Sequence, residues 1–422
     1  MNPYQHSFGV NIPQDVAGKQ GENVIFIVYT LKDSPETLGK VKDVCANFSA
    51  LIRSMRNRFP DMMFSCTMGF GADAWNRLFP EQGKPKELKT FEEIKGEKHT
   101  AVSTPGDLLF HIRAKQMGLC FEFASIIDEK LQGVVEPVDE THGFRYMDGK
   151  AIIGFVDGTE NPAVDENPYH FAVVGEEDAD FAGGSYVFVQ KYIHDMVAWN
   201  SLPVEEQEKV IGRRKFNDVE LSDEEKPQNA HNAVTNIGDD LKIVRANMPF
   251  ANTSKGEYGT YFIGYASTFT TTRQMLESMF IGNPVGNTDR LLDFSTAVTG
   301  TLFFAPSYDL LSELGEQKIK DWGEDYTLVI SSTTDWSFTF LQVHTKNSGC
   351  FRAPCKVSGR IISLVRRSIA TVAYRIPSLL HFSINALFSS STLYSICVIL
   401  CRCKVMENMY ILCNNIPVIY GK

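Results

Sequence analysis

The feature that most constrains the fold is a pattern of strands and helices that occurs twice along the chain. In the first half, residues 24–31 and 107–114 are rich in β-branched and aromatic side chains, which predicts two strands about 80 residues apart. Between them, an amphipathic stretch from about Glu36 to Arg58 predicts a helix. The first half therefore contains a strand–helix–strand unit.

The second half repeats this order about 155 residues later. Residues 183–193 and 259–268 predict strands. A charged region at 204–213 predicts a helix, and residues 270–280 predict a second helix with a capped start. We therefore predict the α+β class, with two similar domains that are each an antiparallel sheet covered by helices.

The bulk composition excludes some classes of protein. The chain has 422 residues, enough for two or three domains, and its net charge of −10 argues against generic nucleic-acid binding. The first 20 residues lack the basic and apolar regions of a secretory signal. Before residue 346 the chain has three scattered cysteines, Cys45, Cys66 and Cys120, which fit a reducing compartment. We expect a cytoplasmic protein.

The sequence changes character near its carboxyl end. Residues 346–422 hold ten Lys and Arg side chains but a single acid, Glu407, and six of the nine cysteines lie in the last 73 residues. Cys397, Cys401 and Cys403 are a weak candidate for a metal site, because no second cluster matches them. Two different kinds of sequence are joined here.

Within this tail, Ile376 to Cys401 is a run of 26 residues without Asp, Glu, Lys or Arg. Its length would span a bilayer, but its six serines make it a poor hydrocarbon-facing helix. Three interpretations stay open: a membrane anchor, a packed or interfacial segment, and a disordered or non-native tail. The last is favoured, so we expect no membrane association.

Three polar residues in the second half suggest redox chemistry. Asp157 lies in the turn-like motif GFVDGTENP (154–162), His231 follows in QNAHNAV, and Arg245 follows in KIVRANMPF. Haem iron in peroxidases needs one axial ligand, usually a neutral imidazole. The opposite face needs a base that moves a proton between the peroxide oxygens, and a fixed positive charge. His231, Asp157 and Arg245 can supply these parts.

A carboxylate base has a consequence for pH dependence. Aspartate has an ordinary pKa of about 3.9, so Asp157 stays a competent base in acid, where an imidazole would be protonated. We therefore expect an acidic optimum for turnover. Taken singly, each residue also has an ordinary structural explanation: an Asx turn at Asp157, a loop side chain at His231 and a solvated strand end at Arg245.

The words around these residues resemble the dye-decolourising peroxidase family, in its bacterial-type (class B) branch. The signature GxxDG is matched by residues 154–158. Further matching words follow the family's order over residues 6–316: HGFRYMDG (142–149), AGGSYVFVQKYIHD (182–195), VIGRRK (210–215), KIVRANMP (242–249), YGTYFIGYA (258–266) and GNTDRLLDFSTAVTGTLFFAPS (286–307). GxxDG alone is a weak signal, whereas the ordered set is specific.

The resemblance implies a fold and a cofactor. It implies two ferredoxin-like domains, at 1–150 and 151–316, with haem b, one per chain, held by the second domain. Residues 317–422 would be an extension of uncertain structure. The implied activity is a haem-dependent peroxidase that reduces hydrogen peroxide and oxidises dye-type or phenolic donors through an oxoferryl intermediate.

The resemblance also implies a role for each site residue. Asp157, Arg245 and Asn247 would form the distal, peroxide-binding side, and His231 would be the iron ligand. Phe262 would be a wall above the haem. Arg213 would bind a haem propionate, with the adjacent Arg214 as the alternative. Asp289 would accept the imidazole N–H of His231, with Asp293 as its rival.

Other assignments stay open. Met275, Met279 and Phe280 fit ordinary helix core better than haem contacts. Trp75 and Trp199 are candidate surface relays for donors too large to reach a buried haem. A homo-oligomer is possible, and the tail shows no convincing encapsulin-loading peptide. The alternative function is a haem-handling protein for storage, delivery or iron release. A ferredoxin-like binding module without haem would leave the Asp–His–Arg set unexplained.

Overall fold

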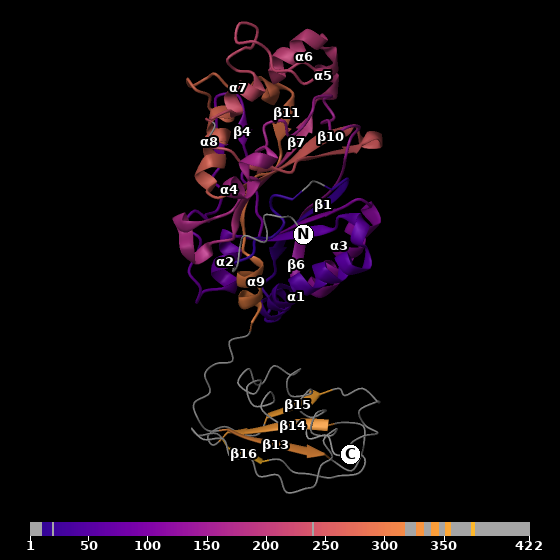
Figure 1. Cartoon of the computed structure of the whole chain (residues 1–422), viewed down its shortest axis with the longest axis vertical. Coiled ribbons are helices and arrows are strands. Elements are labelled where there is room, and N and C mark those ends of the chain that lie inside the picture. Colours follow the sequence, from indigo (N-terminus) through magenta and orange to yellow (C-terminus); the bar gives the residue numbers. More distant parts are fainter. Residues whose placement is uncertain are drawn as a thin grey trace, which may run out of the picture. The chain divides into compact units, whose positions relative to one another are not determined.

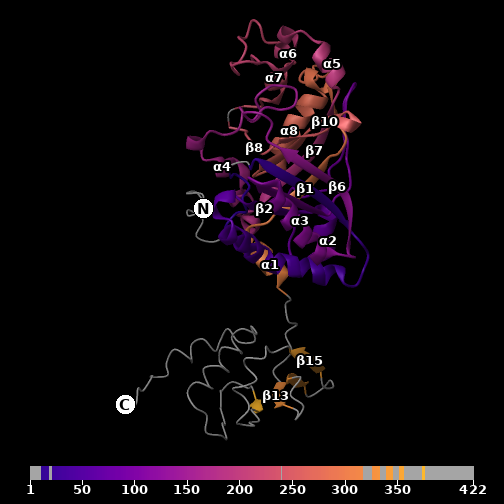
Figure 2. The same ribbon diagram turned by 90° about the vertical axis from the view of Figure 1, so that its right-hand side faces the viewer.

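The predicted repeat forms the larger of two compact units. The computed structural model describes residues 11–18, 21–238 and 240–316, together with the backbone of four strands between residues 326 and 375. The chain divides into the units Met1–Gln317 and Lys318–Lys422. In the first unit, helices lie around a large sheet (Figures 1 and 2).

The first half of this unit has the strand–helix–strand order that the sequence predicted. Its main elements are β1 (Asn23–Leu31), α1 (Thr37–Arg58), β2 (Ser65–Gly71), β5 (Leu108–Ala114), α3 (Met117–Leu131) and β6 (Val135–Phe144). The connection from β2 to β5 contains α2 (Ala72–Leu78) and the hairpin β3 (Ile94–Lys95) and β4 (Thr100–Ala101). The strands pair antiparallel in the order β6-β1-β5-β2.

The second half repeats the arrangement with more helices. After α4 (Pro168–Ala172), its elements are β7 (Ser185–His194), α5 (Met196–Ser201), α6 (Val204–Ile211), α7 (His231–Thr235), β8 (Val244–Arg245), β9 (Met248–Asn252), β10 (Glu257–Ala266), α8 (Phe269–Phe280), β11 (Ser295–Ala297), β12 (Thr301–Ala305) and α9 (Tyr308–Gly315). The strand order is β12-β7-β10-β8. Read across the sheet, the four main strands of each half are the fourth, first, third and second of that half in chain order, which confirms the predicted duplication.

The two halves share one sheet, which the sequence did not predict. Edge strand β12 pairs with edge strand β2 at Phe303↔Gly71 and Phe304↔Phe70, so the strands form a single 10-stranded sheet. This pairing satisfies backbone groups that two separate sheets would leave exposed at their edges. Helix α9 then packs against α1 of the first half. A Cβ atom at Gly315 would lie 2.2 Å from the amide nitrogen of Ala46, so this helix contact requires a glycine.

The core lies on both faces of the sheet. In β1, Ile25 and Ile27 belong to the apolar cluster that includes α1 and α3, whereas Val24, Phe26 and Val28 belong to a cluster with strands of the second half. Because both faces are covered, β1 is a continuous apolar run rather than an alternating one. The ring of Phe26 stacks on His111 of β5 and on Tyr261 of β10, at centroid distances of 4.8 and 3.9 Å.

Helix α8 differs from its prediction at its start. Thr268 is the N-cap residue, but its side chain makes no capping hydrogen bond. Instead, the carboxylate of Glu87 accepts the backbone N–H of Thr270 at 2.7 Å and bonds its hydroxyl at 3.1 Å. A carboxylate from the first half therefore satisfies a free N–H group of this helix.

The second unit contains a small antiparallel sheet of its own. Its strands are β13 (Tyr326–Ser332), β14 (Thr339–Thr345), β15 (Phe351–Cys355) and β16 (Ala373–Arg375), in the order β15-β14-β13-β16. No helix in the described part of the chain is long and apolar enough to cross a membrane. The apolar run 376–401 and the candidate metal site at Cys397, Cys401 and Cys403 lie outside the described residues.

Phe26 should be a major contributor to stability, because it is buried and contacts both halves. We expect Phe26→Ala to lower the free energy of unfolding by about 3–5 kcal/mol, since it removes a large side chain from a packed core. The matched control is Phe121→Ala, because Phe121 is 60% exposed. Urea unfolding of both variants tests this prediction. A loss below about 1 kcal/mol for Phe26→Ala would contradict the described packing.

Candidate active site

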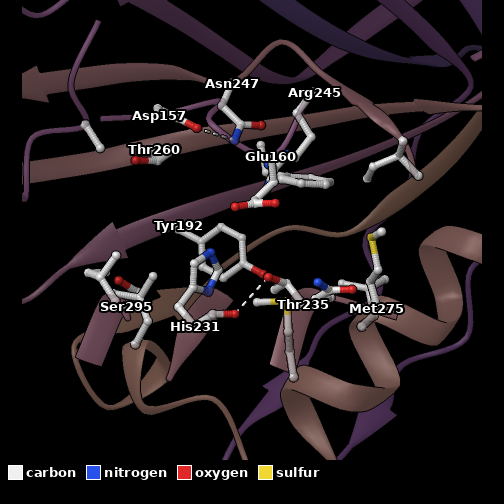
Figure 3. Close-up of a pocket in the computed structure, with 18 of the residues that line it drawn as sticks. Asp157, Glu160, Tyr192, His231, Thr235, Arg245, Asn247, Thr260, Met275 and Ser295 are labelled. Atoms are coloured by element: carbon white, nitrogen blue, oxygen red, sulfur yellow. Dashed lines mark hydrogen bonds between the residues drawn. The ribbon is translucent and has the colours of Figure 1, made fainter. Parts of the chain in front are cut away.

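A cavity of about 240 Å³ lies in the second half of the described chain. Its lining is mostly apolar and comes from residues between Ala151 and Ser295. Figure 3 shows Asp157, Asn247 and Arg245 on one wall, with His231 on the opposite wall. Five predicted site residues line this cavity: Asp157, His231, Arg245, Asn247 and Phe262.

The turn that carries Asp157 depends on its two glycines. Gly154 and Gly158 have φ angles of +94° and +85°, which L-residues with a Cβ rarely adopt. The backbone N–H of Asp157 donates to the carbonyl of Gly149 at 3.1 Å. The Asp157 carboxylate accepts a hydrogen bond from the Asn247 amide at 3.2 Å. The GxxDG motif thus forms a tight turn that presents a carboxylate to the cavity.

Strand β10 positions the other residues of this wall. Arg245 of β8 pairs with Gly264 of β10. The side-chain oxygen of Asn247 accepts the backbone N–H of Ile263 at 3.2 Å, which leaves its amide nitrogen to donate to Asp157. Phe262 of β10 lines the cavity beside them.

Arg245 is the cation of this wall. Burial lowers the pKa of the Arg245 guanidinium below its usual range, while the carboxylates of Asp157 and Glu160 oppose that change. The residue lines the cavity. Because an arginine is in practice always protonated in proteins, Arg245 brings a fixed positive charge to the site.

The opposite wall is built around a histidine–carboxylate pair. His231 is the first residue of α7, and its Nδ1 lies 2.7 Å from Oδ2 of Asp289. Asp289 is fully buried, and its other oxygen accepts the backbone N–H of Leu291 at 2.8 Å. The rival residue, Asp293, instead bonds Nε2 of His99 at 3.0 Å. With Nδ1 held by Asp289, Nε2 is the ring nitrogen of His231 left for a ligand bond in the cavity.

Arg213 does not line the cavity. Its guanidinium bonds the carbonyl of Asp218 at 2.8 Å and pairs with the carboxylate of Glu160, which does line the cavity. The neighbouring Arg214 pairs with Glu208 and Glu225. Both arginines therefore have carboxylate partners that the sequence alone did not indicate.

The sequence left open the role of three residues on helix α8, and two of them line the cavity. Met275 and Met279 line the cavity, whereas Phe280 is buried in the core. The expectation of ordinary helix core therefore holds for Phe280, whereas the two methionines are wall residues of the cavity.

A second histidine, His194, lines the cavity and was missed by sequence reasoning. Its Nδ1 lies 2.7 Å from the hydroxyl of Ser295, and its Nε2 lies 3.0 Å from the hydroxyl of Thr260. Burial lowers its pKa to about 4, so the ring is neutral near pH 7. Because both ring nitrogens are engaged, His194 is a poorer metal ligand than His231. The sequence offered one weak signal, its position at the end of a predicted strand.

The structure corrects the assignment of two tryptophans as surface relays. Trp75 and Trp199 are 1% and 0% exposed. Their indole N–H groups donate to the carbonyls of Gly83 and Ile153, at 2.9 and 3.0 Å. Each ring also packs against phenylalanines, as the buried part of an aromatic cluster. Neither residue can meet a donor at the surface.

The comparison with protein families agrees with this site. Residues 13–145 match the model for the N-terminal domain of Dyp-type peroxidases, and residues 148–310 match the model for the C-terminal domain. The chain belongs to the Dyp-type peroxidase family. It is therefore a peroxidase, and the predicted pair of ferredoxin-like domains is confirmed.

Individual members of the Dyp-type peroxidase family are similar over most of their length. A dye-decolorizing peroxidase from Rhodococcus erythropolis is 53% identical over 306 residues, which are 72% of this chain and 89% of that protein. The crystal structure of a dye-decolorizing peroxidase from Bacteroides thetaiotaomicron is 89% identical, with a TM-score of 0.72, and covers 73% of this chain and all of that one. A variant of DypB from Rhodococcus jostii in complex with heme is 47% identical, with a TM-score of 0.69, covering 72% and 99% of the two chains.

The buried His194 should make this peroxidase less stable in acid. Its folded-state pKa of about 4 lies below the ordinary value of 6.5, so the unfolded chain binds a proton that the folded chain does not bind between these pH values. Stability is therefore lost as the pH falls from about 6.5 to about 4. Between pH 7 and pH 4.5, we expect wild type to lose about 2–3 kcal/mol more than His194→Asn does.

Urea unfolding at the two pH values measures this difference. The control is His142→Asn, because His142 is an exposed histidine on β6. Its pH profile should follow that of wild type. Parallel pH profiles for wild type and His194→Asn would contradict the lowered pKa.

Proposed function

We propose that this peroxidase binds one haem b per chain in the cavity between Asp157 and His231, with Nε2 of His231 as the iron ligand. The proposal is supported by the single available imidazole. Among the residues that the structure describes, no group of three His, Cys, Asp or Glu side chains could hold a metal ion. A metal in this cavity would therefore need further ligands from a cofactor, and a porphyrin supplies four. The heme complex of the Rhodococcus jostii relative supports the same cofactor.

Asp289 is the residue that prepares His231 for this role. Its carboxylate accepts the N–H at Nδ1, which fixes the tautomer and the orientation of the ring. The hydrogen bond also makes the ligating nitrogen more basic, and a more basic ligand stabilises oxidised iron. When bound, the haem supplies the iron that reacts with hydrogen peroxide. The chain's own residues then handle the proton and the charge.

Asp157 and Arg245 carry out these two tasks on the opposite wall. Asp157 accepts the proton from one oxygen of the peroxide and returns it to the other oxygen, which leaves as water. Arg245 stabilises the negative charge that develops as the O–O bond breaks. Asn247 holds the Asp157 carboxylate through its amide N–H. The observation that carries the proposal is this acid–cation pair facing an available histidine, since haem carriage would require neither residue.

The reducing substrates are limited by access to the cavity, because a donor too large to enter beside a bound cofactor must react at its rim. We propose small phenolic or dye-type molecules that give up electrons at the rim of the cavity.

A homo-oligomer and a cytoplasmic location stay predictions from the sequence. The tail, where encapsulin loading found no support in the sequence, lies outside the described residues after Arg375.

The proposed domain boundaries fit this assignment. All residues that line the cavity lie between positions 151 and 295, within the proposed haem domain at 151–316. The domain at 1–150 packs against it through the shared sheet. The extension at 317–422 coincides, within one residue, with the second compact unit.

The distal residues are tested by single substitutions in the haem-loaded chain. We expect Asp157→Ala to slow the reaction with hydrogen peroxide by about 10²–10⁴-fold, and Arg245→Leu by about 10²–10³-fold. Stopped-flow absorbance of the Soret band measures both rates. The matched control for the arginine is Arg273→Leu, which removes a partly exposed surface pair with Glu277 on α8. If both distal variants react as fast as this control, the assignment of the peroxide-binding wall is wrong.

A further inference from the structure

Asn161 joins the two halves of the proposed distal wall. It lies four residues after Asp157, in the same turn, and its side-chain amide bonds the backbone of Arg245 twice. The amide nitrogen of Asn161 donates to the carbonyl of Arg245 at 2.9 Å. Its side-chain oxygen accepts the backbone N–H of Arg245 at 2.8 Å.

The backbone of Arg245 needs such a partner because β8 is an edge strand. The N–H of Ala246 donates to the carbonyl of Ile263 in β10 at 3.0 Å, so this residue faces β10. In an antiparallel pair, neighbouring residues face opposite sides, and the N–H and C=O of Arg245 therefore face away from β10. A primary amide has one acceptor oxygen and an N–H donor in one plane, and so it can replace a peptide group of a further strand.

The approach of this amide depends on the second glycine of the motif. The backbone N–H of Asn161 donates to the carbonyl of Gly158 at 3.0 Å. A Cβ atom at Gly158 would lie 3.2 Å from the amide nitrogen of Asn161, which is tighter than nine in ten real Cβ contacts. Gly158 thus allows both the positive φ of the turn and the position of the amide. The turn that presents Asp157 therefore also carries the clamp, by which we mean the two hydrogen bonds from the Asn161 amide to the Arg245 backbone.

We propose that Asn161 is a positioning residue for peroxide cleavage, in which its amide sets the place of Arg245 relative to Asp157. The inference rests on the proposed function. Asn247 fixes the Asp157 carboxylate to β10, and Asn161 fixes the Arg245 backbone to the Asp157 turn. Two asparagines that need not react themselves thereby fix the position of the Asp157 carboxylate relative to the Arg245 guanidinium.

Other contacts hold the same loops, so the loss of Asn161 should not unfold them. Lys242 pairs with Glu166 at 2.5 Å, and the hydroxyl of Thr159 donates to Asp218 at 2.6 Å. These contacts lie outside the clamp and do not touch the Arg245 backbone. Removal of the amide should therefore shift Arg245 while the cavity and the His231 wall stay formed.

Two variants of the haem-loaded chain test the proposal. Asn161→Ala removes both bonds, whereas Asn161→Asp keeps an acceptor for the Arg245 N–H and loses the donor to its carbonyl. We expect the second-order rate constant with hydrogen peroxide to fall about 10- to 100-fold in Asn161→Ala, because a misplacement of about 1 Å can cost this much. The fall in Asn161→Asp should be smaller. The KM for the organic donor and the Soret spectrum at rest should stay those of wild type.

A second readout does not depend on activity. In the haem-free chain, hydrogen exchange of the Arg245 amide should become at least about tenfold faster in Asn161→Ala, because its hydrogen-bond acceptor is lost. Exchange within α1 should not change. The control is Asn217→Ala, which removes an exposed asparagine whose side chain bonds the backbone of Val219. This control should leave both readouts unchanged.

The outcomes separate the proposal from the proposed function. If wild type itself reacts slowly with peroxide, the peroxidase assignment of the site fails, whatever the variants do. If wild type reacts fast and Asn161→Ala reacts equally fast, despite faster exchange at Arg245, the positioning role is overturned. The role is also overturned if the rate falls together with loss of haem binding, or without a change in exchange at Arg245.

Discussion

The pairing of β10 with its neighbours is the constraint on which the proposed distal wall depends. On one side, β10 pairs with β7 in a register that sets Phe262 opposite Gln190. On the other side, Gly264 lies opposite Arg245 of β8. Because side chains alternate along a strand, a slip of one residue would turn Phe262 and Arg245 away from the cavity. The register of the sheet therefore fixes which side chains of this wall face the cavity.

The opposite wall has no such ladder and depends on a buried carboxylate. Asp289 is fully buried, and its two oxygens bond Nδ1 of His231 and the backbone N–H of Leu291. A buried carboxylate is costly unless it is paired and hydrogen-bonded, so these contacts offset its burial and hold α7 in place. The cavity lies between a wall fixed by strand register and a wall fixed by one carboxylate. Substitutions should therefore affect the two walls independently.

Sequence reasoning identified what is local or carried by ordered motifs. Runs of β-branched and aromatic residues gave β1, β5, β7 and β10 within a few residues, and motif order brought out Asp157, His231 and Arg245. Non-local contacts were beyond its reach. The pairing of β2 with β12, the capping of α8 by Glu87 and the carboxylate partners of Arg213 join segments distant in the chain. His194 escaped notice because burial and two hydroxyl partners, rather than any local pattern, give it its properties.

We propose that His231, polarised by Asp289, ligates the haem iron. The most direct measurement is the iron–histidine stretching band in the resonance Raman spectrum of the ferrous, haem-loaded chain. The account predicts a band that is lost in His231→Ala, shifts to lower frequency in Asp289→Asn and is unchanged in Asp293→Asn. A band that persists in His231→Ala, or that Asp289→Asn leaves in place, would contradict the account.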